Sequence, residues 1–167
     1  NRELVEATTR DEIEAAVIEQ FARSDQYAFA WISAQHVTNE SVRPRSWAGI
    51  DDGDIEALVD AINETEEPDP VSRASETGQV QIAGCTDPES TWCGPWQNRD
   101  YRMVGAIPLT YGETAYGVLC IGTRDEEAFE DIETAVFQEL GDTIAYAINA
   151  VESKEALIYG TAELVDR

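Results

Sequence analysis

Cysteines carry the most reactive side chains of this sequence, and there are three of them, Cys85, Cys93 and Cys120. Their number is odd and their spacing shows no pairing, so we do not expect a disulfide framework. Cys93 lies in the pentapeptide Trp-Cys-Gly-Pro-Trp at 92–96, which is half of a Cys-x-x-Cys redox motif. Trp96 stands where the second cysteine would be, so no thiol within the motif can complete an exchange cycle. We expect a turn with aromatic packing here.

Metal binding would require Cys85, Cys93 and His36, the only histidine. The spacing of these residues matches no zinc pattern. His36 directly follows a predicted strand, where a surface histidine is the common outcome. We therefore expect no metal site.

Aromatic side chains suggest a binding site of another kind, because one small domain contains four tryptophans and two of them lie in an irregular segment. These side chains could line an apolar pocket for a flat ligand, or they could be ordinary core aromatics. The sequence leaves both alternatives open. The candidate ligand-binding residues are Phe29, Trp31, Trp47, Trp92, Cys93, Trp96, Tyr101 and Met103.

Charge limits the possible partners. Thirty-four acidic residues against 11 basic ones give a net charge of −23, and Lys154 is the only lysine. Such a surface repels phosphate backbones and anionic lipids, so we expect no direct contact with nucleic acid or membrane. The remaining basic residues are arginines, and four of them could bind an anionic ligand, although ion pairs with the many carboxylates are the simpler expectation. These four are Arg43, Arg45, Arg99 and Arg102.

The same composition predicts a salt requirement. Self-repulsion among so many carboxylates destabilises the compact state in dilute buffer, and molar salt screens it. The composition is typical of organisms that accumulate salt, with an acidic protein from an ordinary organism as the alternative. No apolar run reaches the roughly 18 residues of a membrane span, and no signal-peptide pattern opens the chain, so we expect a cytoplasmic location.

The elements that must position these residues can be predicted from periodicity and turn signals, within one domain of 167 residues. A capping box at 9–12 begins the first helix, and a second one at 123–126 begins a last helix of about 25 residues with an apolar stripe from Phe129 to Val151. Between them we predict strands at 26–33, 42–48, 79–82, 102–110 and 115–123, short helices at 51–63 and 71–77, and an irregular segment at 83–99. In the first strand, Tyr27, Phe29 and Trp31 would face one side and Ala28, Ala30 and Ile32 the other. Gly78 would end the helix at 71–77.

This order predicts an α+β fold with one antiparallel sheet of five to six strands. The terminal helices would cover one face of the sheet. The small helices and the long loop at 83–99 would cover the other.

The chain resembles a GAF domain. The resemblance lies in the strands at 104–109 and 116–121, in Phe129 and Asp131, in the helix segment at 140–150, and in the short Ala-Ser-Glu-Thr-Gly-Gln run at 74–79. It implies a GAF/PAS-like sheet over nearly the whole chain. With its acidic composition, the chain is similar to the GAF domains of haloarchaeal transcription regulators of the bacterio-opsin activator type.

This resemblance implies a sensory domain that binds a small molecule or receives a signal, with no catalysis, and a separate DNA-binding segment downstream. We expect a GAF domain at 1–152 and an exit linker or the start of a signalling helix at 153–167. In such proteins the terminal helices often pack against a second copy, so we expect a homodimer through them. The resemblance names neither the ligand nor a cofactor.

One enzyme class stays open as an alternative. Free methionine-R-sulfoxide reductases are stand-alone GAF proteins with cysteine chemistry, and Cys93 with Cys85 could serve as the catalytic and resolving thiols. The glycine-rich cysteine segment of that family should fall near 71–78, where this chain has no cysteine. Covalent attachment of a bilin to either thiol lacks the neighbouring Cys-His pair that usually marks such sites.

Overall fold

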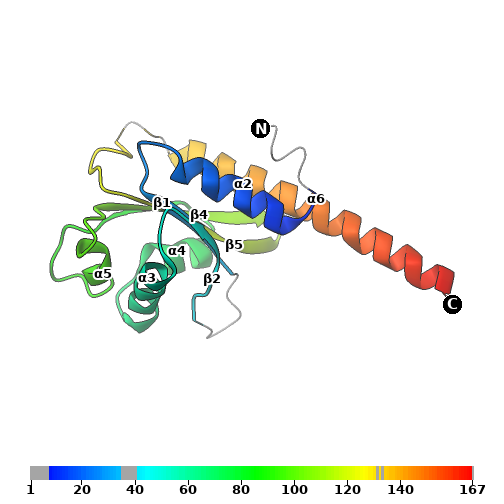
Figure 1. Ribbon diagram of the computed structural model, residues 1–167, viewed down its shortest axis with the longest axis horizontal. Helices are drawn as coiled ribbons and strands as arrows, with labels where there is room; N and C mark the ends of the chain where they lie inside the picture. The colour runs from blue at the N-terminus through cyan, green and yellow to red at the C-terminus, as the bar shows by residue number, and fades with distance from the viewer. Residues whose placement is uncertain (1–7, 35–40, 131, 133, 167) are drawn as a thin grey trace.

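Five antiparallel strands form the central sheet, in the order β2-β1-β5-β4-β3 (Figure 1). The computed structural model describes residues 8–34, 41–130, 132 and 134–166, so His36 and Asp131 lie outside the described residues. The sheet confirms the predicted α+β class. The strands are β1 Phe29–Ser33, β2 Pro44–Ala48, β3 Gln81–Gly84, β4 Met103–Tyr111 and β5 Thr114–Thr123.

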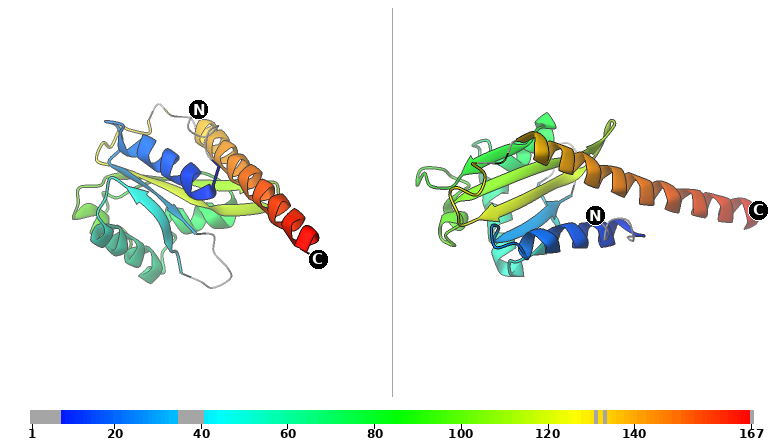
Figure 2. Two further views of the ribbon diagram at one scale, coloured as in Figure 1. Left: turned by 45° about the vertical axis from the view of Figure 1, so that its right-hand side comes forward. Right: turned by 90° about the horizontal axis from the view of Figure 1, so that it is seen from above.

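Helices cover both faces of the sheet, as predicted. The first and last of the described helices, α2 Arg10–Ala22 and α6 Thr134–Asp166, lie on one face and contact each other (Figures 1 and 2). The three short helices, α3 Asp52–Glu64, α4 Pro70–Thr77 and α5 Gly94–Gln97, lie on the other. Each face has its own hydrophobic core, and the two cores share no residue.

The alternation along β1 separates these two cores. Phe29 and Trp31 point toward the short helices, whereas Ala30 and Ile32 point toward α2 and α6. Tyr27 was expected on the same face as Phe29, and this was wrong, because the strand begins only at Phe29. The Tyr27 ring packs on the α2/α6 side instead, with its centroid 5.9 Å from that of Phe129.

The first predicted helix cap is confirmed and the second is wrong. The Thr9 hydroxyl accepts from the N–H of Glu12 at 3.2 Å and caps α2. Thr123 instead ends β5, and its hydroxyl donates to the Gln26 carbonyl at 2.8 Å, so α6 begins eleven residues later, at Thr134. The short strand expected at 79–82 lies at 81–84, because Gly78 caps α4 with a left-handed φ of 68° and two more residues are needed to reach the sheet.

Helix α6 crosses the sheet and then continues past it for several turns (Figures 1 and 2). Phe137, Ile144 and Ile148 are buried against the sheet, whereas Leu157 is 72% exposed. The helix ends at Asp166, well beyond the predicted end near residue 153. Among the described residues, no helix is both long enough and apolar enough to cross a membrane.

Candidate functional site

Six of the eight candidate ligand-binding residues lie together in the core between the sheet and the short helices. The Phe29 ring centroid is 4.7 Å from that of Tyr101 and 5.7 Å from that of Trp96, and the Trp96 ring lies edge-on to Trp92 at 5.9 Å. These rings pack directly against one another. The six residues, called the aromatic cluster below, are Phe29, Trp31, Trp92, Cys93, Trp96 and Tyr101.

Helix α5 and the turn that follows it build most of this cluster from a stretch without regular periodicity. The Tyr101 N–H donates to the Trp96 carbonyl at 3.0 Å, and Asp100 adopts a left-handed φ of 61° between them. This turn sends the chain back on itself, so both rings enter the same core. Asp tolerates the left-handed region better than most residues do, which suits the position.

The other two candidates lie elsewhere. Trp47 on β2 is half-buried at the rim of the cluster, and its indole N–H donates to the Asp52 carboxylate at 2.9 Å. Met103 belongs to the opposite core, below α2 and α6. The prediction that Met103 lines the same pocket is therefore wrong, because side chains alternate along β4 and its neighbour Val104 takes the cluster side.

Two indole N–H groups in the aromatic cluster are chemically unusual. Trp31 and Trp96 are fully buried. The Trp96 Nε1 finds no hydrogen-bond partner among the described residues, whereas the Trp31 indole interacts with the thiol of Cys120, a weak acceptor. An unsatisfied buried donor costs about 1–3 kcal/mol. A bound molecule with an acceptor atom would recover part of that free energy.

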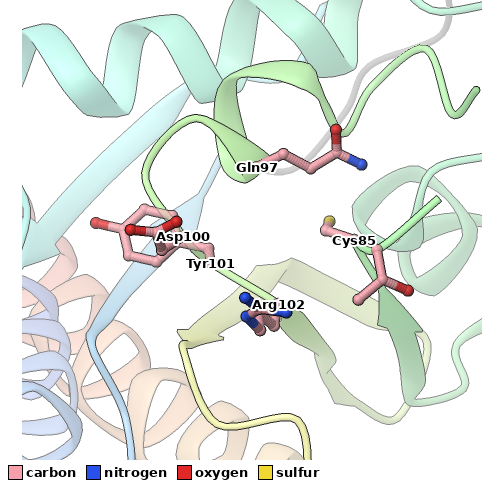
Figure 3. Close-up of a pocket in the computed structure, with 6 residues that line it drawn as sticks. Cys85, Gln97, Asp100, Tyr101 and Arg102 are labelled. Atoms are coloured by element: carbon pink, nitrogen blue, oxygen red, sulfur yellow. The ribbon is translucent and has the colours of Figure 1, made fainter. Parts of the chain in front are cut away.

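A cavity of about 240 Å³ opens beside the cluster (Figure 3). Cys85, Gln97 and Tyr101 line it together with Arg102, and Figure 3 shows their side chains gathered around the opening. The Cys85 sulfur contacts the sulfur of Cys93 at 2.9 Å. The structure thus brings together two thiols that lie eight residues apart in the sequence.

The three thiols differ in acidity. The hydrogen bond with Cys85 is the main reason that the pKa of Cys93 lies below the ordinary thiol value. That hydrogen bond and burial raise the pKa of Cys85. Burial alone is the largest cause of the raised pKa of Cys120, which lies in β5 across from Trp31.

The arginines form ion pairs, as expected for so acidic a chain. Arg99 contacts Asp54 at 2.8 Å, and Arg102 contacts Glu126 at 2.8 Å. Arg45 contacts the buried Glu14 at 2.9 Å, while Arg43 lines a groove of about 490 Å³ beside Trp47. Within the part of the chain that the structure describes, no three potential metal-ligating side chains cluster together.

Sequence reasoning missed a polar network where α6 leaves the sheet. Arg10 on α2 contacts Glu14 at 2.9 Å, donates to the Tyr116 carbonyl at 2.6 Å and contacts Glu152 of α6 at 3.4 Å. Asn149 of α6 donates to the Tyr116 hydroxyl at 2.9 Å. The sequence did contain a signal, namely the position of Glu14 next to Ile13 on the apolar side of the first helix. In the structure the Glu14 side chain is only 1% exposed. The exit network, as we call it below, consists of Arg10, Glu14, Tyr116, Asn149 and Glu152.

Comparison with known proteins agrees with this architecture. Over 158 residues the chain is 25% identical to the bacterioopsin transcriptional activator of Halobacterium salinarum, covering 95% of this chain but only 22% of that protein. The chain thus spans about a fifth of the length of this relative.

Solved structures share the fold at low sequence identity. The GAF domain of an Acinetobacter phosphoenolpyruvate-protein phosphotransferase has a TM-score of 0.64 at 11% identity, covering 93% of this chain and 91% of that one. A type II free methionine-R-sulfoxide reductase from Thermoplasma acidophilum has a TM-score of 0.57 at 12% identity, covering 85% and 96%. The GAF domain family model matches residues 7–149, and the chain therefore belongs to the GAF domain family.

Proposed function

We propose that this chain is the signal-receiving domain of a larger halophilic transcription regulator, which binds a small molecule and transmits its presence through α6. The similarity to a Halobacterium transcriptional activator and the net charge of −23 support this proposal. The charge also disfavours direct contact with DNA, so another part of the regulator would bind the promoter. A cytoplasmic location is part of this proposal, because the acidic surface suits a salt-rich cytoplasm.

One observation carries the proposal: a single helix connects the sheet to the region beyond it. Ile144 and Ile148 of α6 are buried against the sheet, and the same helix continues to Asp166. The exit network fixes the helix at the point of departure, through Asn149 and Glu152. A change in the packing of the sheet would therefore move the projecting part of α6 as a rigid body.

The proposed ligand site is the aromatic cluster and its adjoining cavity. The cluster touches β1 and β5, which lie directly beneath α2 and α6. Occupancy would shift the population between two packings of the sheet against α6. An aromatic or heteroaromatic molecule with an acceptor atom suits the tilted and edge-on rings of the cluster and the buried Trp96 N–H.

Ligand binding can be tested on the chain itself in molar KCl. Heteroaromatic metabolites would be screened by tryptophan fluorescence and thermal unfolding. A ligand present at 100 times its dissociation constant adds about 2.7 kcal/mol to the free energy of unfolding. The variant Trp96→Phe should bind such a ligand more weakly, whereas Tyr146→Phe on the exposed face of α6 should bind it normally. A panel in which no compound changes either signal would contradict the small-molecule part of the proposal.

Transmission through α6 can be tested in the parent regulator. Two residues inserted after Ser153 rotate the downstream helix by about 200°, whereas seven residues restore its face. We expect transcription from the target promoter to change with the two-residue insertion and to stay normal with seven. If both variants match the wild type, α6 does not carry the signal.

The boundary at residue 152 and a homodimer through α2 and α6 are parts of the same proposal. Tyr146 and Val136 are each 58% exposed on α6, and the Tyr146 ring packs edge-on against Tyr111 at 5.4 Å. These apolar side chains fit a helix that meets a second copy. Light scattering in molar KCl should give twice the 18.4 kDa of one chain, and a monomer would contradict this part.

Free methionine-R-sulfoxide reduction remains the second candidate, and the contact between Cys85 and Cys93 at 2.9 Å is the observation in its favour. The similarity of fold to the Thermoplasma reductase gives it a scaffold. We expect the purified chain to leave methionine-R-sulfoxide unchanged in the presence of a thiol reductant. Its consumption at a rate that Cys93→Ser abolishes would make the protein an enzyme.

A further inference from the structure

The contact between Cys85 and Cys93 is built into the backbone on both sides. Cys85 directly follows β3, and its N–H donates to the Arg102 carbonyl at 2.8 Å. Cys93 precedes α5, and its carbonyl accepts from the N–H of Gln97 at 2.8 Å. Both side chains are buried, at 2% and 0% exposure. Two thiols held this way need almost no rearrangement to react with each other.

Small molecules can reach one of the two sulfurs, that of Cys85, through the cavity. The cavity of about 240 Å³ reaches Cys85, whereas Cys93 is not among the residues that line it (Figure 3). A molecule of a few atoms can enter and touch the Cys85 sulfur. A bulky disulfide such as oxidised glutathione cannot align with a sulfur that is only 2% exposed.

We propose that Cys85 and Cys93 form a modification site at which a small hydroperoxide is reduced while the two thiols are oxidised to a disulfide. The modification site shares the cavity and Cys93 with the proposed ligand site. Its chemistry does not rest on the proposed function, because it needs neither a bound metabolite nor a response of α6. It also differs from sulfoxide reduction, because the oxidant is a peroxide.

The step balances with one hydroperoxide per chain. The singly ionised pair starts with its one proton on Cys85, hydrogen-bonded to the Cys93 thiolate. As the Cys85 sulfur attacks the peroxide oxygen and breaks the O–O bond, that proton passes to Cys93. Cys85 becomes a sulfenic acid, and the alkoxide or hydroxide that leaves takes the proton held by Cys93. The Cys93 thiolate then attacks the Cys85 sulfur, the S–S bond forms and hydroxide departs. Two electrons pass from the thiols to the peroxide.

The acidity of the pair supports this chemistry. The hydrogen bond between the thiols lowers the pKa of Cys93, so the pair loses its first proton more readily than an isolated buried thiol would. Over a contact of 2.9 Å, that charge can pass to the sulfur that faces the cavity. Cys120 has a pKa raised by complete burial and does not share this property.

Oxidation would also alter the aromatic cluster. A disulfide bond is about 2.05 Å long, so the two sulfurs must approach by roughly 0.9 Å. Trp92 immediately precedes Cys93, and Trp96 lies in the helix that Cys93 begins. The shift therefore reaches the rings that contact Phe29 of β1. Tryptophan fluorescence should report the change.

The test uses the reduced chain in molar KCl with one equivalent of hydrogen peroxide. We expect titratable thiols to fall from three to one per chain, the intact mass to fall by two hydrogens, and peptide mapping to link Cys85 to Cys93. Oxidised glutathione, and methionine-R-sulfoxide as a third oxidant, should react at least tenfold more slowly. A mass that rises by oxygen atoms without loss of hydrogen would overturn the proposal, as would an unreactive pair or faster oxidation by the sulfoxide.

Two variants identify which thiols react, and the covalent state of the wild-type chain remains the deciding measurement. Cys93→Ser should stop at an oxygen adduct on Cys85, with no internal disulfide, whereas the matched control Cys120→Ala should still lose two hydrogens. A disulfide that involves Cys120 in the wild type would contradict the assignment. Because the readout is the covalent state of the wild-type chain, it is unaffected by failure of the ligand screen or of the α6 insertions.

Discussion

The approach of α6 to β4 gives a sharp test of the fold that positions the transmitting helix. Gly141 lies in the middle of α6, where glycine ordinarily weakens a helix by roughly 0.5–1 kcal/mol relative to alanine. A Cβ at this position would collide with the backbone oxygen of Pro108 and lie 2.9 Å from the Ile107 Cγ2. Because the first obstacle is backbone, no change of rotamer relieves it.

The expected effect of Gly141→Ala is therefore the opposite of that of an ordinary helical glycine. Because the obstacle is backbone, we expect an overpacking cost of about 2–3 kcal/mol, the upper part of the usual range. A helix-propensity gain of about 1 kcal/mol then leaves a net loss of about 1–2 kcal/mol in the free energy of unfolding. For a chain of this length, that loss corresponds to a fall in Tm of roughly 2–8 °C. Gly53→Ala is the matched control, since α3 leaves open space around that position. It should stabilise the protein by up to about 1 kcal/mol.

Both variants would be measured by urea unfolding and thermal unfolding in molar KCl, followed by circular dichroism at the helix band. Opposite signs for the two substitutions are the expected result. If Gly141→Ala stabilised the protein as much as Gly53→Ala does, α6 could not lie this close to β4, and the proposed transmitting helix would lose its contact with the sheet.

Three further predictions concern charge. With a net charge of −23, the chain should unfold below about 0.5 M KCl by circular dichroism, and full stability in dilute buffer would contradict the screening argument. Glu14→Ala leaves Arg10 and Arg45 without their shared carboxylate. Because these arginine side chains are 20% and 33% exposed, we expect the free energy of unfolding in urea to fall by about 2 kcal/mol. An unchanged midpoint would refute the role of the exit network. Burial raises the pKa of Cys120, and the hydrogen bond with Cys93 and burial raise that of Cys85, so both keep their protons in the folded state while the unfolded thiols ionise near 9.0. Stability should then fall by about 2 kcal/mol between pH 9 and 10, and Cys120→Ala should remove about half of that fall.

Local patterns predicted the fold well wherever the signal was a property of neighbouring residues. The Thr9 cap, the glycine end of α4 and the alternation of Phe29 with Ala30 all depend on near neighbours, and all three are confirmed. The same kind of signal misled at Thr123, where the capping motif is present but a longer-range bond to Gln26 keeps the residue in the sheet. A sequence cannot show which of two partners a hydroxyl will find.

The candidate site was predicted in part. Its aromatic members were recognisable from residue type, and five of them meet in one core together with Cys93. Met103 was assigned to the wrong face, because alternation along β4 sends its side chain to the face opposite that of Val104. The exit network was missed, because Arg10, Tyr116 and Glu152 are brought together only by the packing of α2 and α6 on the sheet.

By itself the sequence determined the α+β class, the acidic composition and the kinship with GAF domains, because these depend on composition, periodicity and local motifs. Only the tertiary structure decided that Cys85 and Cys93 touch, that Gly141 must be small and that α6 is held where it leaves the sheet. The contacts of Gly141 and of Asn149 join segments distant in the chain, and the contact between Cys85 and Cys93 depends on how the irregular segment between β3 and α5 folds back. Such contacts depend on the register of strands and on the angle of a helix, and no local pattern specifies either of them.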